Sequence, residues 1–443
     1  MGPPPERVRS RWVMNSECRA HQCADQPRVG PCALTFEEVE RWAAAGQVDG
    51  DLDGIHLARV ITEEVRRAGK HFLPQPFLLQ LSEIRRRHAT GRRPFLRAFL
   101  DCLLDKHEER YWNRTYLSLP LLELISDEPG HGPGPNRLAT WLISDVVRFE
   151  MQSAAAPQEP ADPASERDRP GAVTLRKRLR HALRFVAHDH DGLDVEDLSP
   201  RAAELLPRPA ATEAGRWFEV TVQPVYVLHD EYFFMRALQA HEMVFTAIAQ
   251  DMRAAIAALR DGCLEPAAMC VDRAAASFER ASALFRLVAT MRPEHFHGFR
   301  EFTQGASAIQ SEQYKRFEIL CGLPHAGRLG SEAFTSVPAV RAEAQEADHD
   351  TVTHAYLDLR RRARFSWTDW NLFHTALGGL EERHQRWKST HRSLATRMLG
   401  SARGSGDTEG VPYLTQCLDN RLFGRLGGQR DPRCGQAEPG TSH

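Results

Sequence analysis

Long apolar runs, net charge and paired cysteines are all scarce in this chain of 443 residues. No uninterrupted apolar run approaches the roughly 18 residues that a membrane span requires, and the opening segment MGPPPERVRSRW lacks the apolar stretch of a secretory signal. The formal net charge of -2 provides no overall field that would attract nucleic acid or an anionic membrane. We therefore expect a cytoplasmic protein that binds neither nucleic acid nor membranes.

Cysteine usage argues against a disulfide framework. The nine cysteines are scattered through a long chain, and their odd number leaves at least one unpaired. Cys18, Cys23 and Cys32 lie close to His21, but a second clean Cys/His pair that would complete a zinc site is missing. The C-x-x-C-H motif is also missing, which argues against covalently attached c-type haem.

Composition and apolar periodicity divide the chain into five parts. Residues 1–34 are expected to be disordered. Residues 35–150 contain several amphipathic helical runs broken by Gly and Pro and carry no catalytic motif, so they predict a small helical accessory domain, for instance one used in dimerisation. Residues 151–172 are rich in Ala, Pro and charge and read as a linker. The main domain covers residues 173–425, and residues 426–443 form a disordered tail.

The main domain is expected to be all-α. Residues 243–290 predict an antiparallel helix pair that turns near Asp261. Asp230 is a candidate N-cap for the helix that leads into this pair. Only Trp217–Leu228 alternates apolar and polar residues and could be extended, and Pro224 limits it to an edge or irregular segment.

Residues 381–416 combine a helix with a glycine-rich loop. The apolar stripe of this helix, at i, i+4, i+7 and i+11, consists of Trp387, His391, Leu394 and Met398. A histidine in such a stripe is often a core residue bonded to a backbone carbonyl. The helix is expected to stop at Gly400. The loop after it, however, carries three further glycines that allow close approach of a ligand, and Ser405 adds a hydroxyl. Together these features favour His391 as an axial ligand of haem iron.

Three ordered blocks resemble the tryptophan 2,3-dioxygenase family. The W-x-x-x-H run at 387–391 and the following RGSGDTEGVPYL are similar to that family's haem-ligand helix and its RGTGGSSGxxYL loop. DEYFFMRALQAHEMVF at 230–245 resembles DExLFIIxHQxxELWF, and residues 291–318 resemble LTPxxFxxFRDxLxxxSGFQSxQYRxIE. The resemblance covers roughly residues 200–425. It implies a helical core that binds haem b through His391 and assembles as a homo-oligomer, a dimer or a tetramer.

The same resemblance assigns substrate-binding residues. Arg300 matches an arginine that grips the substrate carboxylate, a task suited to a planar guanidinium; a structural salt bridge is the alternative. Ser405 keeps the hydroxyl of the usual loop Thr, whereas Asp407 replaces a glycine. Phe234 matches an aromatic pocket wall, and Phe296 lies four residues before Arg300. The implied substrates are a free aromatic α-amino acid and O2 or peroxide.

The sequence departs from the family pattern on the distal side of the expected haem. Leu238 stands where the pattern has a histidine, and Leu238 can neither donate a hydrogen bond nor take a proton. His241 follows at i+3 and could present its imidazole to the same cavity, although a buried histidine bonded to a carbonyl is an equal alternative. We place both residues among the candidate catalytic positions.

Three function classes follow. A haem dioxygenase would insert both oxygen atoms into tryptophan or an analogue, and the matching ligand helix and clamp favour it. A haem monooxygenase that hydroxylates tyrosine, tryptophan or an indole in a specialised pathway is favoured by Leu238 and Asp407. A haem protein without turnover is the third class.

Overall fold

The computed structural model describes residues 33–44, 53–89, 92–105, 107, 112–155, 169–190, 192–303, 310–400, 410–424 and 426. These residues form helices and irregular connections without any strand, so the predicted all-α fold is confirmed. The candidate zinc cysteines and nearly all of the predicted disordered ends lie outside the described residues. None of the described helices is long and apolar enough to cross a membrane.

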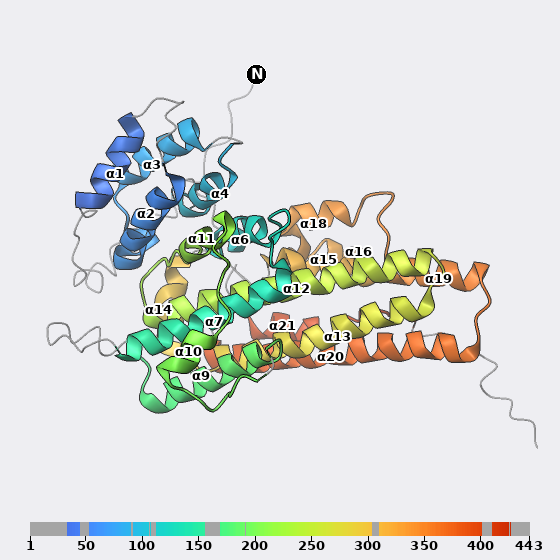
Figure 1. Ribbon diagram of the computed structural model, residues 1–443. Coiled ribbons are helices and arrows are strands. Elements are labelled where there is room, and N and C mark those ends of the chain that lie inside the picture. The colour runs from blue at the N-terminus through green and yellow to red at the C-terminus, as the bar shows by residue number, and fades with distance from the viewer. Residues whose placement is uncertain are drawn as a thin grey trace, which may run out of the picture.

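The first part of the chain forms a cluster of short helices that leads into one longer helix (Figure 1). Its elements are α1 (Ala33–Ala44), α2 (Gly54–Ala68), η1 (Lys70–Phe72), α3 (Gln75–His88), α4 (Pro94–Leu103), α5 (Asn113–Tyr116), α6 (Leu119–Ser126) and α7 (Gly134–Ala155). Prolines stand in the first turns of α3, α4 and α6, where a missing N–H costs nothing. Gly69 ends α2 with a φ of 85°, and a Cβ there would lie 2.7 Å from the Val225 carbonyl oxygen.

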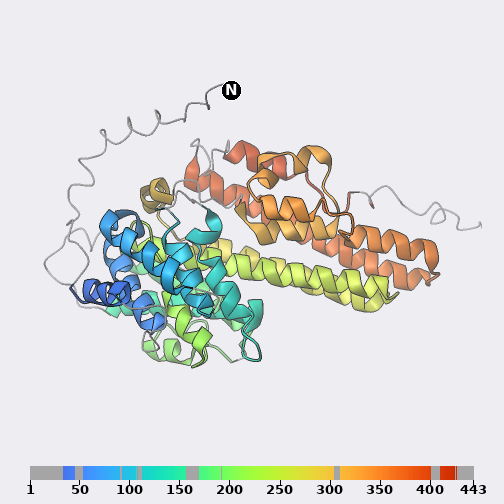
Figure 2. The ribbon, with the colours of Figure 1, turned by 90° about the horizontal axis from the view of Figure 1, so that it is seen from above.

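Three long helices form the body of the molecule, and the short N-terminal helices gather at one end of it (Figures 1 and 2). The elements of this second part are α9 (Ala172–Ala187), α10 (Pro200–Leu205), α11 (Glu213–Trp217), η2 (Phe218–Val220), α12 (His229–Arg260), α13 (Leu264–Val288), α14 (Pro293–Thr303), α15 (Glu312–Cys321), α16 (Ala326–Leu329), α17 (Glu332–Thr335), α18 (Pro338–Glu343), α19 (Val352–Arg362), α20 (Trp367–Leu399) and α21 (Val411–Cys417). The predicted helix pair is confirmed as α12 and α13, and α20 packs along α13.

One apolar core runs through both parts of the chain, from Val39 to Phe423. Helix α7 belongs to the predicted accessory domain, yet its Asp145 accepts hydrogen bonds from Tyr232 and Arg236 of α12, both at 2.7 Å. Helix α7, which precedes the predicted linker at 151–172, therefore packs directly on α12, which follows it. The domain boundary at this linker remains a prediction.

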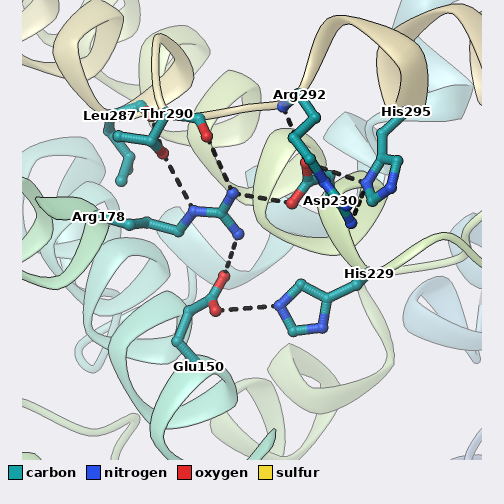
Figure 3. A network of polar contacts seen from close by, with 8 residues as sticks. All are labelled: Glu150, Arg178, His229, Asp230, Leu287, Thr290, Arg292 and His295. Atoms are coloured by element: carbon teal, nitrogen blue, oxygen red, sulfur yellow. Dashed lines mark hydrogen bonds and ion pairs between the residues drawn. The ribbon is translucent and has the colours of Figure 1, made fainter. Parts of the chain in front are cut away.

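A buried ionic network fixes the start of α12 (Figure 3). The fully buried Arg178 of α9 pairs with Glu150 of α7 at 2.5 Å and with Asp230 of α12 at 2.8 Å. Asp230 also accepts hydrogen bonds from the backbone N–H of Arg292 and from His295, which holds the beginning of α14. The expected role of Asp230 as N-cap was wrong, because α12 begins one residue earlier, at His229. The Asp230 carboxylate instead pairs with Arg178.

The segment 217–228 forms a helical turn followed by irregular chain rather than a strand. Its backbone N–H groups at Val225 and Tyr226 donate to the Glu231 carboxylate at 2.7 and 3.0 Å. The Pro224 carbonyl accepts from the Lys70 N–H. These polar groups are satisfied by side chains and by η1, so no ladder partner is needed.

Candidate functional site

A cavity of about 250 Å³ lies between α12, α13, α14, α15 and α20, with α5, α16 and α21 completing its wall. Six of the seven residues singled out from the sequence line it: Phe234, Leu238, His241, Phe296, Arg300 and His391. The seventh, Ser405, falls in 401–409, outside the described residues. Residues that are up to 157 positions apart in the chain thus meet in one place.

His391 presents its imidazole from α20 to this cavity. Its ring stacks on Phe285 of α13 at 5.2 Å with an interplanar angle of 15°, and Trp387 packs against it at 5.6 Å. Among the described residues no side chain or carbonyl hydrogen-bonds the imidazole. Burial, with a smaller contribution from the Lys315 charge, lowers the pKa of His391 to about 4, so the ring is neutral at neutral pH. A neutral, aimed and unengaged imidazole is what a haem iron requires.

Buried cations lie on the wall of the same cavity. Lys315 and Arg328 share a single carboxylate, Glu318, at 3.3 and 2.6 Å. Lys388 donates instead to the backbone carbonyls of Cys417 and Asn420, at 2.9 and 2.6 Å. Burial lowers the pKa of Lys388 to about 8. The wall therefore carries more positive than negative charge, which suits an anionic group.

The opposite part of the cavity is aromatic and carries the predicted clamp. Phe234 packs against Phe296 at 5.8 Å and against Phe299 at 5.2 Å. The Arg300 guanidinium lies 5.9 Å from the centre of the Phe296 ring. Arg300 is partly buried, so its charge is only partly hydrated and can bind a carboxylate strongly.

The two candidate distal residues differ in what they offer. Leu238 faces the cavity with an apolar side chain. His241 is buried, and its Nδ1 lies 3.1 Å from the Ala237 carbonyl oxygen while its Nε2 lies 3.0 Å from that of Ala281. Burial lowers the pKa of His241 to about 4. A neutral imidazole carries one N–H and so donates to one of these two carbonyls. Because both nitrogens face backbone carbonyls, this geometry favours the structural role that the sequence left open beside that of a proton donor.

Several features of the cavity wall are suited to binding a haem. The Nε1 of Trp387 and the Nε of Arg328 are buried on the cavity wall and have no hydrogen-bond partner among the described residues. A group bound in the cavity could supply partners for these atoms. An apolar cavity with one unengaged imidazole and an excess of buried cations matches a flat iron macrocycle that carries two carboxylates.

Sequence reasoning missed several lining residues. Asn113 and Tyr116 of α5 and the following Leu117 come from the predicted accessory domain, where no motif signalled a contact with the site. Glu242 was also missed, although it follows Leu238 by one helical turn and the i, i+4 spacing places both on one face.

Together, the helical fold and this cavity define an all-α protein in which the unengaged imidazole of His391 is directed into an apolar pocket that also carries an arginine. The sequence model of the family described as tryptophan 2,3-dioxygenase matches residues 220–335. The tryptophan 2,3-dioxygenase of Burkholderia pseudomallei (strain 668) is 29% identical over 233 residues, which cover 45% of this chain and 75% of the relative. The tryptophan 2,3-dioxygenase of Burkholderia mallei (strain SAVP1) matches with the same identity and coverage.

These similarities support the tryptophan 2,3-dioxygenase family for this part of the chain and indicate an oxidoreductase. The matched region contains α12 to α15, which supply the aromatic wall and Arg300. His391 and the N-terminal residues Asn113 and Tyr116 lie outside the matched family model.

Proposed function

We propose that this protein is a haem-dependent oxygenase that acts on a free aromatic α-amino acid, inserting both atoms of O2 into L-tryptophan or an analogue. One observation carries the proposal: a single cavity joins the neutral imidazole of His391 to the Arg300 guanidinium across an aromatic wall. Haem b is the proposed cofactor, and its chemistry when bound is the activation of oxygen.

The residues of the chain then have distinct tasks. His391 ligates the iron, and the stacked Phe285 ring fixes the imidazole in one orientation. Arg300 binds the substrate carboxylate and so orients the amino acid. Phe234 and Phe296 pack on the aromatic ring and exclude water. No protein base is needed for this reaction, because an electron-rich indole reacts with activated oxygen without one.

A monooxygenase that hydroxylates an aromatic ring is the second candidate. The observation that favours it is Leu238, which lies in the cavity where the family pattern has a histidine. The wall contributed by Asn113, Tyr116 and Leu117 adds residues from outside the matched family region, and these can alter which ring is accepted.

Haem binding and product mass test the proposal. His391→Ala should abolish or grossly alter the Soret band, whereas His56→Ala, a change at an exposed histidine of α2, should leave it unchanged. An unaltered ferric spectrum in His391→Ala would contradict the ligand assignment. Incubation of the wild type with tryptophan and with tyrosine, in the presence of O2 or peroxide, separates the candidates. Two added oxygens support the dioxygenase, one supports the monooxygenase, and no product with either amino acid contradicts both.

A further inference from the structure

Glu242 is a buried carboxyl group on the cavity wall that neither ligates the expected haem nor clamps a carboxylate. It lies on α12, one turn beyond Leu238, and is only 4% exposed. Its Oε2 has no hydrogen-bond partner among the residues that the structure describes. Burying a carboxyl oxygen without a partner is unfavourable, so the position of this oxygen on a cavity wall points to a donor on the bound molecule.

Two further polar side chains lie on the same wall. Asn113 of α5 is buried, and its side-chain amide makes no hydrogen bond to the described residues. Ser311, the N-cap of α15, also lines the cavity. Burial raises the pKa of Glu242 to about 7, and a hydrogen bond with Ser311 opposes this rise.

The corner between α5, α12 and α15 is held rigidly. Arg114, next to Asn113, pairs with Glu312 at 3.2 Å, and the Asn113 N–H donates to the Gln310 side chain at 2.9 Å. The charges of Arg114 and Glu312 act on Glu242 in opposite directions. Arg114 is already paired with Glu123 and Glu312, so its positive charge is balanced by two carboxylates other than Glu242.

We infer that Glu242, flanked by Asn113 and Ser311, forms a polar subsite that accepts a hydrogen bond from the ring of the substrate, either an indole N–H or a phenol O–H. This inference rests on the proposed function, because it takes an aromatic amino acid as the ligand. A carboxyl group keeps at least one accepting oxygen whether or not it is protonated, so the subsite works in either state.

The distance along α12 between Phe234 and Glu242 is compatible with a clamp at one end of the cavity and a ring-binding subsite at the other. The clamp lies at the Phe234 end, because Arg300 packs on Phe296 and Phe296 packs on Phe234. Eight residues of continuous helix separate Phe234 from Glu242, about 12 Å at 1.5 Å per residue. The carboxylate and the ring of one amino acid can therefore be recognised at separate points of the cavity wall.

Ligand pairs that differ only in the ring donor test the subsite. Calorimetric titration of the haem-loaded protein would compare L-tryptophan with 3-benzothienyl-L-alanine, in which sulfur replaces the N–H, and L-tyrosine with L-phenylalanine. We expect the wild type to bind the donor-bearing member of one pair about 10- to 100-fold more tightly. Glu242→Leu should reduce this preference to less than about threefold, because the accepting oxygens are gone.

Glu242→Gln keeps an accepting oxygen and should retain most of the preference. The matched control Glu382→Gln, at an exposed position of α20, should change nothing. Tryptamine lacks the carboxylate and reports on Arg300 separately: it should bind more weakly than tryptophan to the wild type and to every Glu242 variant.

The possible outcomes separate the two proposals. The subsite would be overturned if folded Glu242→Leu kept the preference for the ligand with the ring donor, or if the wild type showed no such preference. In either case, tighter binding of tryptophan than of tryptamine would still support the Arg300 clamp. If Glu242→Leu does not fold, the comparison of the ligand pairs in the wild type still tests the subsite. Failure of the wild type to bind any of these amino acids would overturn the proposed function and the subsite with it.

Discussion

Arg178→Met should be among the most destabilising single changes in this protein. The guanidinium of Arg178 is fully buried, pairs with Glu150 and Asp230, donates to Thr290 at 3.0 Å and lies 3.8 Å from the Phe233 ring (Figure 3). Methionine fills a similar volume, but the two carboxylates are each 1% exposed and lose their buried cation. Removing one partner of a buried ionic group costs about 3 to 5 kcal/mol.

A matched control separates this effect from the loss of any arginine on the same helix. Arg184 of α9 is exposed and pairs with the exposed Glu196 at 3.6 Å. Surface pairs of this kind contribute about 0 to 1 kcal/mol, so Arg184→Met should hardly change the free energy of unfolding. Chemical denaturation of both variants at neutral pH measures the difference.

The pH dependence of the same measurement checks the cause. Burial alone would raise the pKa of Asp230, but hydrogen bonding with His295 and the Arg178 charge lower it to about 2 in the wild type. The folded pKa lies below the usual 3.8, so the carboxylate stabilises the wild type above about pH 4 and loses this effect as the pH falls towards 2. Without Arg178 the pKa of Asp230 should rise, and the cost of Arg178→Met should shrink on acidification. A cost below about 1 kcal/mol at pH 7, or one that grows on acidification, would refute the reasoning.

Two further predictions concern the cavity. Arg300→Lys should weaken amino-acid binding by about one to two powers of ten, because a point charge cannot reproduce a planar fork; binding of the decarboxylated analogue should stay unchanged, and an equal loss for both ligands would contradict the clamp. His241→Ala should lower stability by about 1 to 3 kcal/mol, because the buried ring and its hydrogen bond to a backbone carbonyl of α12 or α13 are lost, and should leave product identity unchanged. A loss of turnover of about a hundredfold or more in the folded variant would instead show that His241 delivers a proton.

Helical periodicity carried most of what the sequence could predict. The stripe around His391 was read from the i, i+4 and i+7 spacing, and all four of its residues lie on the cavity wall. The stop at Gly400 is also confirmed, since α20 ends there with a φ of 57° at that glycine. Such features depend on residues within a few helical turns of one another, so a short stretch of sequence is enough to predict them.

Features that depend on distant partners could not be predicted in this way. An aspartate at the start of a helix is usually a cap, yet Asp230 is used by Arg178, 52 residues away. Trp217–Leu228 alternates like a strand, but two of its N–H groups, those of Val225 and Tyr226, donate to the Glu231 side chain. In both places a buried carboxyl group determines the local structure, and periodicity does not reveal which groups it binds.

The N-terminal helices illustrate the same limit at the level of function. Their apolar faces predicted a helical accessory domain, but nothing in those faces shows that the segment after α5 reaches the cavity. Gln239 of α12 donates to the Leu117 carbonyl at 3.0 Å, and Tyr116 donates to Glu231 at 3.3 Å. These bonds join the N-terminal wall to the helix that carries Phe234, Leu238 and Glu242. Ring selection at Glu242 therefore depends on the packing of residues that lie outside the matched family region, and a family match alone cannot define the substrate of this enzyme.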